Sequence, residues 1–257
     1  MKTLTNALFS LGLFILLSSQ VVANTLSNSY YESAEAKLIS KDTLGAIADF
    51  RQAISVNNRS WETYNMQGYI KYLQKDYLGA IKEYNKSVGN ESNFALGYFN
   101  RGLALEKLGK TQEAFEDYNR ATDNDPFYSQ AYIKRGNLLA SQNEYVEAID
   151  DYTIAIILNP YATEAYQARA TAYGEIHDYS RQIKDYTKIS KLLPNSSETY
   201  FQRGLVKMQM NKYQSALEDF TKTTELNPTK AEAWEQKKLA ESKLLTSDKE
   251  VFASGKK

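Results

Sequence analysis

The chain of 257 residues contains no cysteine and a single histidine, His177. The missing cysteine excludes disulfide bonds, cysteine zinc ligands and thiol catalysis, and a lone histidine excludes any site that requires two. Only four prolines and twelve glycines are present, which disfavours a long succession of strands and turns. Neither sign of charge is in excess, since 31 Lys and Arg residues balance 31 Asp and Glu residues. A neutral chain has no electrostatic footprint for nucleic acid or an anionic membrane, so we expect neither partner.

The longest apolar run lies at the start of the chain and is too short to span a membrane. The eleven residues from Ala7 to Leu17 are apolar except for a serine and a glycine, whereas a membrane-spanning helix needs about 20. Lys2 before this run and the small residues up to Ala23 match a secretory signal. We predict a signal peptide over residues 1–23, with no membrane span after its cleavage; the alternative is an uncleaved anchor. Export without cysteine favours a bacterial periplasm or a secreted fraction.

Glycine, proline and aromatic residues recur along the chain with a period of 34 residues. The glycines in phase are Gly68, Gly102, Gly136 and Gly204, with Ala170 in the remaining place. All four prolines obey the same period, at Pro126, Pro160, Pro194 and Pro228. Two aromatic series share it, one from Tyr30 to Trp234 and one from Phe50 to Phe220. Agreement between several independent series indicates a repeat architecture.

The repeats begin at Ser27, Trp61, Ala95, Ser129, Thr163 and Ser197 and cover residues 27–60, 61–94, 95–128, 129–162, 163–196 and 197–230. An aromatic residue then stands at position 4, a small residue at 8, alanine at 20, a second aromatic at 24 and proline at 32. This pattern resembles the tetratricopeptide repeat (TPR) family. The resemblance implies an all-α, right-handed superhelical solenoid of antiparallel helix pairs that binds a protein or peptide in its groove.

Helical spacing predicts the same helix pairs from the residues themselves. Positions 4, 8 and 11 share one face of a helix and are expected to face the core, as are positions 20, 24 and 27. Small residues at 8 and 20 are expected to let the two helices approach closely. One pair buries too little apolar surface to offset the entropy of ordering its own residues, so the repeats must stack on one another.

Charged residues recur at positions 7 and 23. Arginine stands at position 7 in four repeats, at Arg101, Arg135, Arg169 and Arg203, and position 23 is acidic in all six. Partly buried charges need partners, so we expect ion pairs, such as Arg135 with Asp117 of the preceding repeat or Asp151 of its own. The alternative is an arginine ladder that binds an acidic ligand.

The fifth repeat and the C-terminal end depart from the pattern. The fifth repeat carries Ala170 at position 8, Gln182 at 20 and Ile189 at 27, all larger than the residues usual there. We therefore predict a splayed or less stable joint. A polar capping helix is expected over residues 231–245 and a disordered tail over 246–257, with residues 24–26 as a short leader.

No pattern in the sequence indicates catalysis. His177 lies at position 15, in the expected turn between two helices, where a solvated histidine is far commoner than a catalytic one. The glycines follow the repeat rather than a phosphate-binding loop, and no cluster has the spacing of metal ligands. We predict that the chain is not an enzyme and has no catalytic residue, metal or cofactor.

Positions 2, 5, 9 and 12 of each first helix form a second stripe beside the predicted core. In TPR proteins this stripe lines the groove that receives peptides. Two apolar-rich stretches of it flank a polar middle. The candidate partner-binding residues are Asn65, Tyr69, Tyr72, Leu96, Phe99, Leu103, Ile133, Asn137, Phe201, Leu205 and Met208. The alternative for positions 5 and 9 is packing against adjacent helices.

The sequence as a whole predicts an exported scaffold that binds a protein or peptide in its groove. The second hypothesis is a structural module that self-associates, through the groove or through an open end of the array. The mass of the mature chain in solution separates these two hypotheses, since only the second requires an oligomer.

Overall fold

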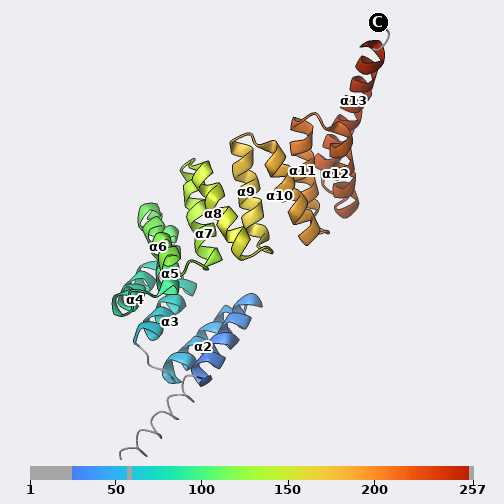
Figure 1. The fold of residues 1–257 in the computed structure, drawn as a ribbon. Coiled ribbons are helices and arrows are strands. Elements are labelled where there is room, and N and C mark those ends of the chain that lie inside the picture. The colour runs from blue at the N-terminus through green and yellow to red at the C-terminus, as the bar shows by residue number, and fades with distance from the viewer. Residues whose placement is uncertain (1–24, 57–59, 255–257) are drawn as a thin grey trace, which may run out of the picture. The chain divides into compact units, whose positions relative to one another are not determined.

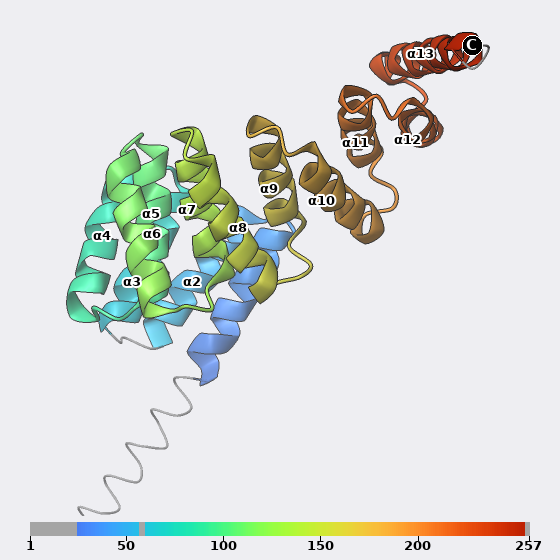
Figure 2. The same cartoon turned by 45° about the horizontal axis from the view of Figure 1, so that its top comes forward.

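A computed structural model describes residues 25–56 and 60–254, and all regular elements among them are helices. The predicted signal peptide lies outside these described residues. The chain divides into an N-terminal unit, Met1–Pro126, and a C-terminal unit, Phe127–Lys257. In each unit, helices that follow one another in the chain lie antiparallel and side by side (Figures 1 and 2). The predicted all-α repeat fold is confirmed.

The second helix of every repeat starts at position 17, and from the third repeat onward each first helix starts at position 1. The N-terminal unit contains a helix over residues 25–39, then α2 (Thr43–Val56), α3 (Ser60–Leu73), α4 (Tyr77–Asn90), α5 (Ala95–Lys107) and α6 (Thr111–Asn124). The C-terminal unit contains α7 (Ser129–Ser141), α8 (Tyr145–Leu158), α9 (Thr163–Glu175), α10 (Tyr179–Leu192), α11 (Ser197–Gln209), α12 (Tyr213–Leu226) and α13 (Ala231–Ser254). Within the described residues, no helix is both long enough and apolar enough to cross a membrane.

A residue in the left-handed region ends the first helix of every repeat, always at position 15. The six residues are Lys41, Lys75, Gly109, Asn143, His177 and Asn211, with φ between 57° and 72°. At Gly109 the backbone N–H bonds to the Glu106 carbonyl, and the next N–H, of Lys110, bonds to the Leu105 carbonyl, both at 3.0 Å. This is the Schellman arrangement that closes a helix. His177 therefore lies in the turn, at a position defined by backbone conformation.

The aromatic ring at position 24 fills the space against the backbone of the first helix. The residues at this position are at most 3% exposed: Phe50, Tyr84, Tyr118, Tyr152, Tyr186 and Phe220. A Cβ atom added to Gly102 would lie 2.7 Å from the Tyr118 ring, and one on Gly136 would lie 2.8 Å from the Tyr152 ring. In these repeats the ring at position 24 occupies the space that a side chain at position 8 would need, which explains why the two series share one period; Ala34 and Ala170 show that alanine is accommodated in two other repeats.

Each arginine at position 7 pairs with the aspartate at position 23 of its own repeat. The shortest N–O distances are 2.6 Å for Arg101–Asp117, Arg135–Asp151 and Arg203–Asp219, and 2.7 Å for Arg169–Asp185. The pairing of Arg135 with Asp151 decides between the two partners predicted for it. In the first two repeats, which lack this arginine, a lysine at position 11 takes its place, as Lys37 with Asp49 and Lys71 with Glu83.

The arginines also connect neighbouring repeats. The Nη1 atom of Arg169 donates to the Thr153 hydroxyl of the preceding repeat at 2.9 Å, and Nη1 of Arg203 donates to the Thr187 hydroxyl at 3.1 Å. In the N-terminal unit, Nη1 of Arg101 donates to Oδ1 of Asn85 at 2.8 Å. One side chain therefore joins the two helices of its own repeat to the second helix of the repeat before.

The buried face of the first helix agrees in part with the predicted one of positions 4, 8 and 11. Position 8 is buried, as are Leu105 and Tyr173 at position 11 and Tyr166 at position 4. The rings of Tyr98, Tyr132 and Tyr200 at position 4, however, are only partly buried. Each of these rings is covered by the guanidinium of position 7, with centroid distances between 5.3 and 5.5 Å. Positions 4 and 7 lie on one edge of a helix, so the ion pair with position 23 turns position 4 to the edge and position 5 inward.

The last helix, α13, is longer than the predicted capping helix of residues 231–245. It continues to Ser254 and takes in most of the segment expected to be a disordered tail, so that expectation is wrong for residues 246–254. No glycine or proline occurs between Ala231 and Ser254. Once a helix is nucleated, each added residue gains a backbone hydrogen bond, and nothing in this segment interrupts it.

Candidate functional site

Four of the predicted partner-binding residues are buried, all of them at position 5. Ile133 has no exposed surface, and Phe201 and Phe99 are 6% and 9% exposed. The Phe99 ring packs on Tyr118 and the Phe201 ring on Phe220, with centroids 5.8 and 6.0 Å apart. Asn65, 4% exposed, accepts a hydrogen bond of 3.1 Å from Nδ2 of Asn100. Position 5 is therefore a packing position, and burial excludes Ile133 as a contact residue.

The predicted residues of the N-terminal unit at positions 2, 9 and 12 remain partly exposed: Leu96, Tyr69, Leu103 and Tyr72. The Tyr69 ring meets the Phe50 ring edge-on at 5.4 Å and stacks on Tyr72 at 6.3 Å. Burial raises the pKa of both tyrosines above the ordinary value, so both hydroxyls stay protonated near neutral pH. These four side chains keep part of their surface open to a partner.

The predicted residues of the C-terminal unit are also divided between packing and exposure. Asn137 is half-buried, and its Oδ1 accepts a hydrogen bond of 2.8 Å from the Tyr152 hydroxyl. Leu205 and Met208 are half-buried and pack on the cluster around Phe201 and Phe220. Asn137 thus has a structural role, whereas Leu205 and Met208 keep part of their surface exposed.

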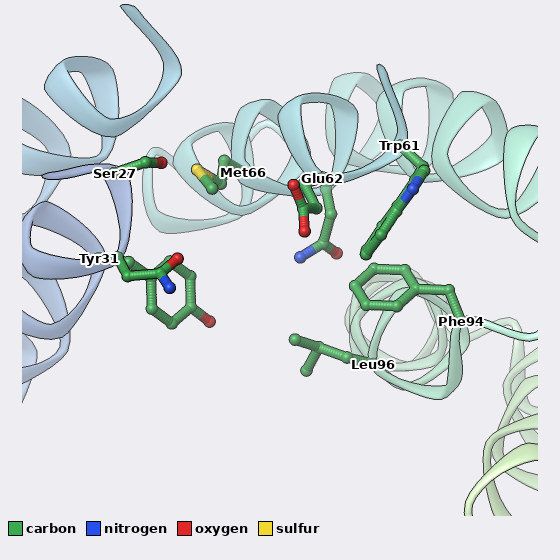
Figure 3. A pocket seen from close by; sticks show the side chains of 9 residues that line it. Ser27, Tyr31, Trp61, Glu62, Met66, Phe94 and Leu96 are labelled. Atoms are coloured by element: carbon green, nitrogen blue, oxygen red, sulfur yellow. The ribbon is translucent and has the colours of Figure 1, made fainter. Parts of the chain in front are cut away.

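An apolar pocket of about 230 Å³ opens in the N-terminal unit between the helix over residues 25–39, α3 and α5. Figure 3 shows the Trp61 and Phe94 rings side by side at one wall, with Tyr31 and Met66 across from them and Leu96 below. The Trp61 and Phe94 centroids are 4.6 Å apart. The lining residues are Ser27, Asn28, Tyr31, Trp61, Glu62, Asn65, Met66, Phe94 and Leu96. Two predicted residues, Asn65 and Leu96, therefore lie in one pocket.

Sequence reasoning missed the aromatic wall, although a signal for it exists. Trp61 stands at position 1, where every other repeat carries serine, threonine or alanine. Phe94 precedes α5 as its capping residue and contributes no side-chain hydrogen bond there. The other repeats carry small side chains at position 1, so the large side chain of Trp61 lines space that those side chains do not reach. The pair of rings therefore distinguishes this part of the array from the rest.

The chemistry of the pocket suits binding rather than catalysis. Its walls are aromatic and aliphatic, and Glu62 supplies one carboxylate. Burial, together with Glu35, raises the pKa of the Tyr31 hydroxyl, which therefore stays protonated at neutral pH. In the described part of the chain, no group of three or more His, Asp or Glu residues is placed to hold a metal ion. Such a surface can hold an apolar side chain, with a polar group at its edge.

Comparison with known proteins identifies the repeats. Family models of the tetratricopeptide repeat match residues 98–163 and 197–230. The chain therefore contains tetratricopeptide repeats in these segments, where the sequence pattern had indicated them. No curated protein matches the chain significantly.

Solved structures of TPR proteins share the fold. MamA is 24% identical, with a TM-score of 0.62 over 68% of this chain and 96% of MamA. YrrB, described as a TPR protein with an unusual peptide-binding site, is 18% identical, with a TM-score of 0.62 over 74% and 97% of the two chains. PilF of Pseudomonas aeruginosa is 16% identical, with a TM-score of 0.67 over 83% and 97%. At these identities the similarity establishes the fold alone.

Proposed function

We propose that the chain is an exported scaffold that binds a peptide segment of a partner protein at the apolar pocket of the N-terminal unit. The observation that carries this proposal is the ring pair Trp61–Phe94, which faces Tyr31 across an open space beside Leu96. Aromatic residues are enriched among those that contribute most to binding energy in protein interfaces. The tetratricopeptide repeats and the fold shared with YrrB, a peptide-binding protein by its description, support the same function.

The ligand is expected to present an apolar side chain to the pocket. A pocket of about 230 Å³ takes one aromatic or large aliphatic side chain rather than a whole small molecule. Tyr69, Tyr72 and Leu103 then extend the contact along the first helices α3 and α5. Because successive first helices lie side by side, a bound segment can run across them and contact more than one repeat.

Export is part of the proposal and is supported by residues 1–23 of the sequence. The test is the N-terminal residue of the chain recovered from the periplasm or the medium of producing cells. Cleavage after Ala23 leaves Asn24 as the first residue. Recovery of the chain only from the cytoplasm, with Met1 retained, contradicts the export.

Binding at the pocket is tested with peptides selected from a random library on the mature chain. Trp61 and Trp234 are the only tryptophans, so a Trp234→Phe variant leaves Trp61 as the reporter of the pocket. The selected peptides are expected to share an apolar anchor residue and to change the emission of Trp61. The Leu96→Asp variant should weaken their binding by about tenfold or more, since burial of a leucine contributes about 1.5–3 kcal/mol.

The matched control is Leu78→Asp, because Leu78 lies in the same unit, on α4, and is 69% exposed. This variant should bind the peptides as tightly as the parent chain. Equal binding by Leu96→Asp, or failure of the library to yield any binding peptide, would remove the proposed function.

Self-association remains the second candidate, and α13 gives it a specific surface. Trp234 is 43%, Leu239 44% and Leu245 63% exposed on this helix. Light scattering of the mature chain distinguishes the candidates. A monomer supports binding of a separate partner, and a dimer that Leu239→Asp dissociates supports self-association.

A further inference from the structure

A second, polar pocket lies in the C-terminal unit, where α9, α10 and α11 meet. Its volume is about 360 Å³, within the range of ligand-binding pockets. The residues that line it are Thr171, Gly174, Glu175, His177, Tyr179, Gln182, Tyr186, Gln202 and Gln209. It belongs to the fifth repeat and the start of the sixth, which is the part of the array where the repeat pattern is least regular.

Two departures from the repeat pattern create this pocket together. Gln182 stands at position 20, where the other five repeats carry alanine. Gly174 stands at position 12 and makes room for it, since a Cβ atom at Gly174 would lie 2.7 Å from Nε2 of Gln182. The larger side chain and the smaller one therefore form a matched pair.

The Gln182 side chain carries a buried acceptor without a donor. Gln182 is 9% exposed, and its Oε1 has no hydrogen-bond partner within residues 25–56 and 60–254. A buried polar atom that lacks its partner is costly and calls for an explanation. The two nearest glutamine amides are engaged elsewhere, because the Gln167 amide donates to the Tyr186 hydroxyl at 3.3 Å and the Gln202 amide donates to Glu198 at 2.6 Å.

The charge of the pocket favours a cationic ligand. Glu175 contributes a carboxylate, and no lysine or arginine lines the pocket. Among the described residues, Glu175 forms no ion pair. The partly exposed Tyr179 ring adds a face that attracts a cation, whereas the Tyr186 ring is buried. A guanidinium offers five N–H donors in a plane, which suits an arrangement of acceptors and an aromatic ring better than a single ammonium does.

We propose that this pocket binds an arginine side chain, with Oε1 of Gln182 accepting one N–H and Glu175 balancing the charge. The inference deepens the proposed function and rests on it, because the arginine would belong to a bound peptide. It places a second specificity element in the C-terminal unit, independent of the apolar pocket around Trp61.

The test is an NMR titration of the isotope-labelled mature chain with four peptides at matched ionic strength. Each is acetyl-Gly-Ser-X-Ser-Gly-amide, where X is arginine, citrulline, norleucine or glutamate. Citrulline keeps the shape and most donors of arginine without its charge. The arginine peptide should produce saturable shifts of the Gln182 and Gln202 side-chain amides, with about tenfold or more weaker binding of citrulline.

The decisive variant is Gln182→Ala, which restores the residue that the other repeats carry and is therefore expected to fold. It should weaken binding of the arginine peptide by about tenfold or more. The control, Gln214→Ala, makes the same change at an exposed position of α12 and should leave binding unchanged. Unfolding curves of both variants verify that the fold is retained.

Three results overturn the inference: no saturable shift with the arginine peptide, undiminished binding by Gln182→Ala, or equal binding of the citrulline or glutamate peptide. Equal binding of citrulline would assign a neutral amide ligand instead. None of these results affects the Leu96→Asp experiment, which concerns the other unit. The two proposals can therefore fail separately.

Discussion

Arg135 holds Asp151 of its own repeat through two parallel hydrogen bonds, Nε to Oδ2 at 2.8 Å and Nη2 to Oδ1 at 2.6 Å. The two residues are 16 positions apart and lie on the two helices of one hairpin. The Asp151 side chain is 6% exposed and that of Arg135 is 20% exposed. The same geometry recurs in three other repeats, which gives the arginines at position 7 a structural role.

Arg135→Ala should lower the free energy of unfolding by about 3 kcal/mol, because it leaves the carboxylate of Asp151 buried without its partner. Urea unfolding measures the change. Arg120→Ala removes the same charge at an exposed position of α6 and should change stability by less than about 0.5 kcal/mol. An Arg135→Ala variant that unfolds like the parent but loses a ligand would favour the arginine ladder instead.

Two tyrosines at position 24 should respond in opposite ways to loss of the hydroxyl. The Tyr84 hydroxyl is buried and has no hydrogen-bond partner among the residues that the structure describes, so Tyr84→Phe should stabilise the chain by about 1 kcal/mol. The Tyr118 hydroxyl donates to Oε2 of Glu106 at 2.7 Å, so Tyr118→Phe should destabilise it by about 1 kcal/mol. The first and sixth repeats already carry phenylalanine here, so both variants fit sterically. Equal effects in urea unfolding would refute the distinction.

Stability should fall as the pH rises above about 10. Burial raises the pKa of Tyr84, Tyr118 and Tyr152 well above the ordinary value. In the unfolded chain these phenols lose protons near pH 10, while the folded chain retains them. The folded state then binds more protons, and its stability decreases with rising pH.

Unfolding curves between about pH 8 and about pH 11 measure this dependence. The free energy of unfolding should decrease less steeply with pH in Tyr152→Phe than in the parent chain, by up to about 1.4 kcal/mol per pH unit. Lysine ion pairs also weaken in this range, and the comparison of variant with parent separates the tyrosine contribution. An unchanged slope would mean that the Tyr152 phenol ionises as readily when folded.

The fifth repeat should be the least stable part of the C-terminal unit. Gln182 replaces alanine at a position of close approach and leaves its Oε1 without a partner. Amides of α9 and α10 should therefore exchange hydrogen faster than those of α7 and α8. Gln182→Ala should slow the exchange in α9 and α10. Uniform protection across the helices of this unit would contradict the prediction.

The period of the sequence predicts the helix pairs because each recurring residue is needed for packing or for ending a helix within its own repeat. A small residue at position 8 makes room for the ring at 24, and proline at 32 follows the end of the second helix in the last four repeats. The existence of the arginine pairs was also predictable from charge. Their choice of partner was not, since spacing alone places Asp117 and Asp151 equally well for Arg135.

The binding surface was less predictable because it depends on the rotation of each first helix. A stripe at helical spacing does not show which edge the arginine at position 7 will occupy. The rotation that brings position 7 to this edge also turns position 5 toward the core. Phe99, Ile133 and Phe201 are therefore buried and do not lie on the predicted surface. Trp61 and Phe94 lie outside the stripe and form a pocket only once adjacent repeats are stacked.

Site-specific photo-crosslinking in producing cells tests most directly whether a partner occupies the pocket. A photoreactive phenylalanine derivative at position 96, in place of Leu96, should yield one defined adduct that a selected peptide prevents. The same derivative in place of Leu78 should yield none. An absence of adduct at position 96, or adducts of equal yield at both positions, would contradict the account.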